Sequence, residues 1–272
     1  MGQSSLSYSE ILMKKCAVLV AASICTALCA EYPTPSIREE QKVMVNGVSE
    51  TWQLQWIGKP KPVCGIEDVP VTFTCPCMGF AYGEGGDLVL RRLQNTVEVD
   101  RLSITSLFGE EFSGVGKIAI IQRWREKAGA DIEASEKDSF AGIVAKRNVV
   151  QVMNFADYVH DGHRTGFYLQ TTTLPCGKNL GVVIGVTSRN PRLHSISSVA
   201  NPGLRLTLRK QHWEALSRTS GAIDVIDWEC GDHFADTETR LSLRMTPDGV
   251  QGMRREYTCP PNPRKLLHEE RF

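Results

Sequence analysis

The chain has 272 residues, of which 42% are hydrophobic and 23% are charged. These fractions are ordinary for a globular protein and exclude wholesale disorder, collagen-like sequence and a membrane protein with many spans. The 31 lysine and arginine residues balance 31 aspartate and glutamate residues. Because no net positive charge is available to hold a phosphate backbone, nucleic acid is not an expected partner.

The first thirty residues predict an export signal. Residues 16–30 contain no charged residue, directly follow Lys14 and Lys15, and are succeeded by polar sequence from Glu31. Basic residues before a short apolar run are typical of a secretory signal peptide. Such a run spans only about 22 Å as a helix, less than the roughly 30 Å of the hydrocarbon core. We therefore expect no stable membrane span.

The predicted signal peptide covers residues 1–30, and the predicted mature domain covers residues 31–272. Translation starts at either Met1 or Met13, because the residues before Met13 are polar and add nothing to a signal. The predicted location is secreted or periplasmic. The expected partner is an extracytoplasmic ligand or protein.

Six cysteines follow the signal, and an even number in an exported chain predicts disulfide bonds. Their pairing is left open by the sequence. They are Cys64, Cys75, Cys77, Cys176, Cys230 and Cys259. A metal site at Cys75-Pro-Cys77 is the alternative, but no second pair at zinc spacing accompanies it. Cys230 and His233 also form only half of a zinc site, so Cys230 is predicted to be disulfide-bonded and His233 to lie in a surface loop.

The first predicted element is a β-hairpin that turns at Asn46-Gly47, the strongest short hairpin signal. In its second arm Trp52, Leu54 and Trp56 alternate with two glutamines. The alternation predicts that the aromatic side chains lie on a buried face of the strand and that the glutamines lie on a solvent-exposed face. Sugar stacking on exposed tryptophans is the alternative for this arm.

Further strand-like segments follow along the chain and predict a mainly β protein, with antiparallel sandwich-like or barrel-like sheets and one or two short helices. The predicted strands are residues 69–74, 87–90, 96–100, 103–108, 117–124, 149–155, 166–174, 181–187, 204–208, 222–228, 238–245 and 249–258. Residues 209–218 predict a helix with Trp213 and Leu216 on one side. Residues 125–147 have the composition of a helix or of a solvent-exposed loop, and they are the candidate boundary within the mature domain. An irregular tail is expected after Cys259.

No complete catalytic signature is found. The sequence contains no Gly-x-Ser-x-Gly elbow, no His-Glu-x-x-His helix and no phosphate-binding loop. Gly114-Val-Gly116 lacks the strand before it and the helix after it that a dinucleotide site requires, so it predicts a plain turn. His194 and His212 could act as bases, but neither has a visible partner. Carboxylates available for a glycosidase are Glu110, Glu111, Asp224, Asp227, Asp232 and Asp236.

One loop has a spacing with a known chemistry. Asp157-Tyr-Val-His-Asp161-Gly162 lies between two predicted strands, and Thr165 follows it. Residues 154–168 resemble the Asp-x-Asp-x-Asp-Gly calcium loops of the FG-GAP and VCBS-type repeats of extracellular β-propellers. The resemblance implies that Asp157, Asp161 and Thr165 are calcium ligands and that Gly162 makes the turn. Val159 replaces the middle carboxylate and cannot bind a cation, so we expect weak or undetectable calcium binding.

These features predict an exported, disulfide-stabilised binding or structural module that uses no cofactor, apart from any weakly bound calcium. The alternative is a secreted hydrolase, directed at glycans, with two carboxylates contributed by separate strands.

Overall fold

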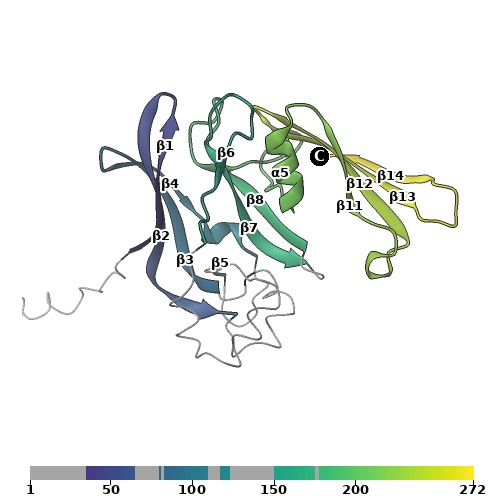
Figure 1. The fold of residues 1–272 in the computed structure, drawn as a ribbon, viewed down its shortest axis with the longest axis horizontal. Coiled ribbons are helices and arrows are strands. Elements are labelled where there is room, and N and C mark those ends of the chain that lie inside the picture. Colours follow the sequence, from purple (N-terminus) through teal and green to yellow (C-terminus); the bar gives the residue numbers. More distant parts are fainter. Residues whose placement is uncertain (1–34, 65–79, 81–82, 110–116, 123–149, 175–177) are drawn as a thin grey trace, which may run out of the picture. The chain divides into compact units, whose positions relative to one another are not determined.

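The computed structural model describes residues 35–64, 80, 83–109, 117–122, 150–174 and 178–272. Within these residues the chain is mainly β, all pairings between its strands are antiparallel, and α5 (Lys210–Arg218) is its one α-helix (Figure 1). The predicted fold class is therefore confirmed. The described sheets are open rather than closed on themselves, so the sandwich-like form of the prediction applies.

Three sheets contain the strands. The first sheet has the order β1-β2-β3-β4 with β5 paired to β3, and its members are β1 (Ser36–Val45), β2 (Val48–Val63), β3 (Gly83–Gln94), β4 (Val97–Ser103) and β5 (Ala119–Gln122). The second sheet has the order β10-β8-β7-β6 with β9 paired to β8, and its members are β6 (Phe155–Ala156), β7 (Gly166–Leu174), β8 (Lys178–Gly185), β9 (His194–Ser195) and β10 (Leu208–Arg209). The third sheet follows the chain, with β11 (Ile223–Trp228), β12 (Thr237–Thr246), β13 (Gly249–Thr258) and β14 (Leu266–Arg271).

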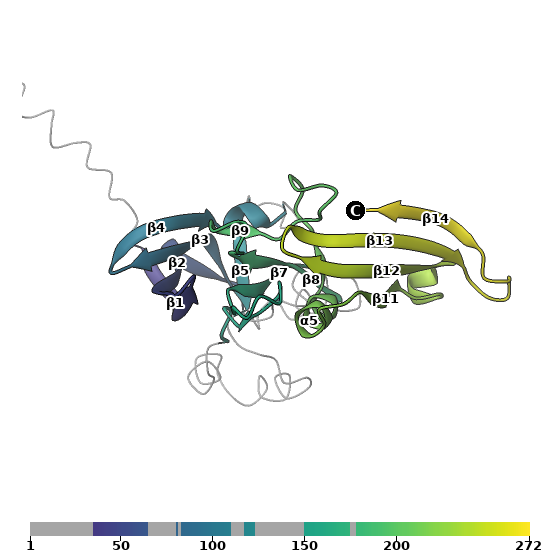
Figure 2. The ribbon, with the colours of Figure 1, turned by 90° about the horizontal axis from the view of Figure 1, so that it is seen from above.

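Two hydrophobic cores contact the second sheet. Val182 and Ile184 of β8 belong to the first core, which also contains buried apolar residues of β2 and β3. Val183, between them, belongs to the second core. Successive strand side chains point to opposite faces, so one strand serves both cores. The second core contains Trp213 and Leu216 of α5, as their predicted position on one side of a helix requires. Both views show α5 beside β8 and β11 (Figures 1 and 2).

The predicted hairpin between β1 and β2 is confirmed. Asn46 and Gly47 both have positive φ values, 49° and 80°, as a two-residue turn of this type requires. Trp52 and Trp56 are 0% and 2% exposed, so the tryptophans belong to the core and the sugar-stacking alternative is wrong. The opposite face carries the glutamines, but Gln55 is covered as well, because Arg91 donates a hydrogen bond to it at 3.0 Å.

Several predicted strands were wrong. Residues 150–154 form no strand, because the amides of Val152 and Met153 donate hydrogen bonds to the Glu39 carboxylate, at 2.6 and 3.0 Å, rather than to a neighbouring strand. Residues 105–107 form a 3-10 turn, and most of residues 204–208 are irregular. The tail after Cys259 is not wholly irregular, since β14 pairs with β13. The predicted strand at residues 69–74 and the candidate boundary at residues 125–147 lie outside the described residues.

A buried ion pair joins β2 and β3. The guanidinium of Arg92 makes two hydrogen bonds of 2.7 Å to the carboxylate of Glu50, and these residues are 6% and 2% exposed. Trp52 Nε1 and Gln94 Nε2 also donate to this carboxylate, at 3.0 and 2.8 Å. Burial alone raises the pKa of Glu50, but the hydrogen bonds from Arg92, Gln94 and Trp52 outweigh it and hold the pKa below its usual range.

The same arginine links the first sheet to a loop that follows the second sheet's β8. Arg92 donates to the carbonyl of Pro191 and lies 3.4 Å from Asp100 on β4, measured from Nη1 to Oδ2. Asp100 in turn accepts a hydrogen bond from the amide of Leu193. One guanidinium therefore holds three strands and a distant loop together.

We predict that Arg92→Met lowers the free energy of unfolding by about 3–5 kcal/mol, because it leaves the Glu50 carboxylate buried without its cation. The matched control is Arg101→Met, which removes a 51% exposed partner of Glu98 and should cost less than about 1 kcal/mol. Urea denaturation of both variants and the unmodified protein provides the measurement. Equal losses in the two variants would show that the buried pair has no special role.

No helix in the described part of the chain is both long enough and apolar enough to cross a membrane.

Candidate functional site

A cavity of about 370 Å³ lies where β5, β7 and α5 come together. Its walls come from six separate parts of the chain, so no single local motif encodes it. The described lining residues are Phe80, Ile120, Ile121, Gln122, Val150, Gln151, Val152, Asn154, Ala156, Tyr158, Tyr168, Leu169, Gln170, Asn179, Lys210, Glu214 and Ser217.

The lining combines apolar and carboxamide side chains. Phe80, Ile120 and Leu169 are 2% exposed or less and belong to the first core. Five glutamine and asparagine residues supply amide groups, namely Gln122, Gln151, Asn154, Gln170 and Asn179. Each carboxamide both donates and accepts hydrogen bonds. An apolar wall with a few convergent polar groups is the usual composition of a small-molecule site.

The strand alternation of β7 places its side chains on both sides of the second sheet. Leu169 belongs to the first core, whereas its neighbour Tyr168 packs against the second core. Gly181 on β8 makes room for this tyrosine, because a Cβ atom there would lie 2.7 Å from the Tyr168 ring and 2.1 Å from the Leu169 carbonyl oxygen. Any larger residue at position 181 would therefore displace the wall of the cavity.

Two tyrosines border the cavity as neutral phenols. Burial raises the pKa of Tyr158 to about 12, and the charge of Glu214 acts in the same direction. Burial also raises the pKa of Tyr168, with Tyr158 and Glu214 adding to the effect. The Tyr158 ring packs edge-to-face on Trp213 of α5, with the ring centres 6.2 Å apart. Both groups therefore stay uncharged at every physiological pH.

The two charged residues of the lining lie on α5. Lys210 Nζ is 3.8 Å from Glu214 Oε1, one helical turn away, and both side chains are about half exposed. The pair contributes no net charge, so the described lining is neutral overall.

The loop that resembles a calcium site is organised by its own backbone. The two carboxylate oxygens of Asp157 accept hydrogen bonds from the amides of Asp161 and Gly162, at 3.2 and 2.8 Å. Asp161 accepts one from the amide of His163, at 3.0 Å. Gly162 makes the turn with a φ of 85°, as the resemblance implies.

The other two positions of that loop point elsewhere. Val159 packs against the second core, and Thr165 is 5% exposed and donates its hydroxyl to the carbonyl of Val186 at 2.9 Å. The structure thus brings Asp157 and Asp161 together without Thr165. Within the described residues no three His, Cys, Asp or Glu side chains gather closely enough to hold a metal ion. Weak or undetectable calcium binding stays a prediction.

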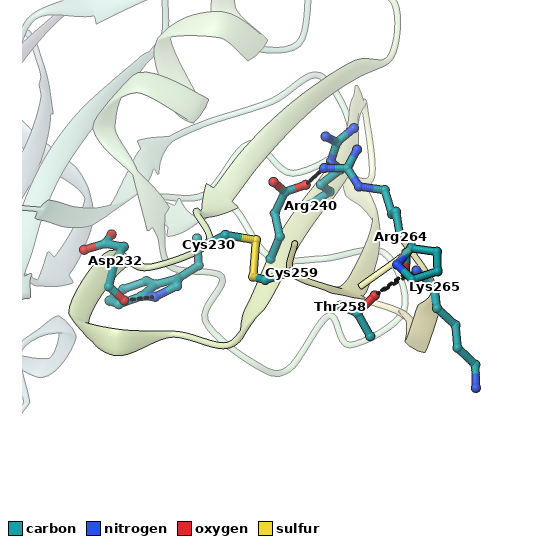
Figure 3. The surroundings of a disulfide bond; sticks show 10 residues. Cys230, Asp232, Arg240, Thr258, Cys259, Arg264 and Lys265 are labelled. Atoms are coloured by element: carbon teal, nitrogen blue, oxygen red, sulfur yellow. Dashed lines mark hydrogen bonds and ion pairs between the residues drawn. A yellow bond between two sulfur atoms is a disulfide. The ribbon is translucent and has the colours of Figure 1, made fainter. Parts of the chain in front are cut away.

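Two of the six predicted half-cystines are joined just beyond the ends of β11 and β13. Cys230 and Cys259 form a disulfide with a Cα–Cα distance of 5.6 Å (Figure 3). Cys64 is also disulfide-bonded. Cys75, Cys77 and Cys176 lie outside the described residues. The Cys230–Cys259 bond confirms the interpretation of Cys230 as a half-cystine.

The disulfide lies beside a network of polar contacts. Glu238 accepts hydrogen bonds of 2.7 Å from the two arginines that are labelled in Figure 3, Arg240 and Arg264. Trp228 Nε1 donates to the carbonyl of Asp232 at 3.1 Å, and the Asp232 carboxylate pairs with Lys178. These contacts are structural, since they join β8, β11, β12 and the turn before β14.

Among the carboxylates and histidines that the sequence offered for catalysis, the structure brings His212 and Asp227 within 3.8 Å of each other. Asp227 lies 3.2 Å from Arg209 Nε, and Asp224 accepts a hydrogen bond from Ser242. His194 Nδ1 lies 2.8 Å from the carbonyl of Arg192. Glu110, Glu111 and the turn at residues 114–116 lie outside the described residues.

His212 on α5 is the most deeply buried of the described histidines. It is 1% exposed, and neither ring nitrogen has a hydrogen-bond partner of normal length among the described residues. Its Nδ1 lies 3.8 Å from Asp227, beside a β-bulge of β11. Burial lowers the pKa of His212 and the charge of Arg209 lowers it further, while Asp227 opposes both.

This lowered pKa makes the folded state sensitive to acid. Above the ordinary histidine pKa of about 6.5, His212 is neutral in both states and stability is independent of its titration. As the pH falls below that value, the unfolded state binds a proton that the folded state rejects, so stability decreases. We predict a loss of at most about 1.4 kcal/mol per pH unit below pH 6.5 from this group.

His212→Phe should flatten the dependence of unfolding free energy on pH between about 5 and 6.5. His268→Gln, on the exposed strand β14, is the matched control. Urea denaturation across this pH range provides the measurement. An unchanged slope in His212→Phe would contradict the prediction.

Comparisons with protein-family models, with curated proteins and with solved structures find no match for this chain. Its function must therefore be argued from the site itself.

Proposed function

We propose that this chain is an exported, disulfide-stabilised binding module whose ligand site is the cavity between β5, β7 and α5. The observation that carries the proposal is the cavity's composition, which combines apolar side chains with five carboxamides and two phenols. The disulfide between Cys230 and Cys259 supports the export part, because such bonds form and persist mainly outside the reducing cytosol.

The ligand is a neutral molecule rich in hydrogen-bonding groups, such as a neutral oligosaccharide. Carboxamides and phenols offer donors and acceptors without charge, and the Lys210–Glu214 pair cancels within the lining. An ionic ligand would enter this neutral site without a compensating charge, which is costly. Apolar faces of the ligand would lie against Ile120 and Leu169.

The alternative of a secreted glycan hydrolase requires two carboxylates on opposite sides of the scissile bond. Glu214 is the one carboxylate that the described lining of the cavity offers, and Lys210 is its partner. No observation therefore favours the hydrolase over the binding module.

The export part is tested by expressing the full chain in a host with a secretion pathway and sequencing the N-terminus of the secreted protein. We predict that it begins within a few residues of Glu31. A secreted protein that retains residues 1–25 would contradict the predicted signal peptide.

The binding part is tested by calorimetry with neutral cello- and chito-oligosaccharides, with oligogalacturonate as an anionic control. We predict that at least one neutral oligosaccharide binds and that Ser217→Trp abolishes this binding, because the indole fills the cavity beside Glu214. Ser220→Trp, at an exposed position just after α5, is the matched control and should bind as the unmodified protein does.

Absence of binding by all neutral oligosaccharides would contradict the ligand class. Binding that survives Ser217→Trp would place the site elsewhere. Preference for oligogalacturonate would show that charge, rather than neutral hydrogen bonding, governs recognition.

A further inference from the structure

The open edge of β1 borders a second groove, of about 430 Å³. Residues 41–44 of β1 form one wall, and Phe155, Gly162, His163 and Arg164 contribute to the other. β1 is the terminal strand of the first sheet, paired with β2 on one side only. The groove therefore runs along a strand edge rather than over a sheet face.

The backbone groups of two residues are available at this edge. In a two-residue hairpin the residues that flank the turn exchange hydrogen bonds, and every second residue does so along the ladder. Val45 and Val43 therefore pair with β2, at Val48 and Glu50. Lys42 and Met44 direct their N–H and C=O groups to the open side, and within the described residues these groups have no hydrogen-bond partner.

No segment of the described chain other than β2 is held against β1 at Lys42 and Met44. Closer to its start, side chains of the strand hold residues 150–153 beside it: Arg38 donates to the carbonyl of Val150 at 3.0 Å, and Gln41 donates to that of Met153 at 2.7 Å. Glu39 accepts from the following amides. The groove begins where these contacts end, so the chain itself blocks one half of the edge and leaves the other half open.

The described lining of the groove contains two cationic side chains and no acidic one. Lys42 and Arg164 line it together with the imidazole of His163, and none of its described lining residues is acidic. The Arg164 guanidinium is fixed on the wall by two hydrogen bonds to the carbonyl of Phe155, at 3.0 and 2.6 Å. The nearby carboxylate of Asp161 accepts the amide of His163 instead.

The groove also has an exposed apolar side chain, that of Met44. Met44 is 54% exposed, although it lies on a regular strand beside the groove. Unpaired strand edges that carry exposed apolar groups are the usual docking sites for a strand from another chain.

We propose that this groove binds an extended acidic segment of a partner protein, which pairs with Lys42 and Met44 as an added strand. Its backbone satisfies the open N–H and C=O groups of β1, and its carboxylates face Lys42 and Arg164. This site is separate from the cavity beside α5 and does not depend on the function proposed for that cavity.

The test uses a short fluorescein-labelled peptide of alternating glutamate and valine, with the mature protein titrated in a fluorescence anisotropy experiment. We expect saturable binding to the unmodified protein. The same peptide with lysine in place of glutamate should not bind. A glutamate peptide that is N-methylated at alternate residues should bind about tenfold more weakly, because it cannot complete the ladder.

Two variants at position 42 separate the contribution of the backbone hydrogen bond to peptide binding from that of the side-chain charge. Lys42→Ala removes the cation and keeps the N–H, and it should weaken binding a few-fold. Lys42→Pro removes the N–H as well, which an edge strand tolerates, and should weaken binding by about a further tenfold. The N-methylated peptide tests the same hydrogen bonds on the unmodified protein, so the result does not depend on the folding of the proline variant.

Hydrogen exchange gives an independent readout. The amides of residues 42 and 44 should exchange more slowly when the glutamate peptide is present. The proposal is overturned if the glutamate peptide does not bind up to about 1 mM, if the lysine peptide binds equally well, or if N-methylation has no effect.

Discussion

The fold depends on the buried charge pair between Glu50 and Arg92. A carboxylate and a guanidinium in the protein interior destabilise the fold unless each keeps its partner. A shift in register between β2 and β3 would therefore leave a buried charge unpaired. The arginine also binds the carbonyl of Pro191, in a loop that follows the second sheet's β8. The cavity takes its walls from both the first and the second sheet, and its width therefore depends on how firmly these sheets are held together.

Local features of the fold could be predicted from the sequence, and features that depend on distant residues could not. The turn at Asn46-Gly47 and the buried Trp52 follow from turn chemistry and from alternation, which act within a few residues. The apolar run at residues 149–155 has the composition of a strand, but a carboxylate more than a hundred positions earlier, that of Glu39, takes its amides. β14 was missed because all six of its side chains are exposed and no alternation marks it.

The candidate site illustrates the same limit. Its carboxamides and tyrosines come from β5, β7, β8 and the segment at residues 150–158, and no single motif contains them all. The one loop with a recognisable spacing, at Asp157, uses its carboxylate to fix its own turn. The charged groups of the described chain mostly neutralise one another in pairs, such as Arg38 with Glu84 and Lys210 with Glu214. Neutral hydrogen-bonding groups therefore predominate among the polar residues that line the cavity.

The bond between Cys230 and Cys259 encloses the whole of β12 and β13, together with the exposed turn at Asp248. A protease that cleaves this turn would open the polypeptide without releasing a fragment. The two pieces would stay joined through the sulfur atoms, and the ladder between β12 and β13 would hold them in register. Where reductants are scarce, the third sheet would thus tolerate a cut in the exposed turn at Asp248.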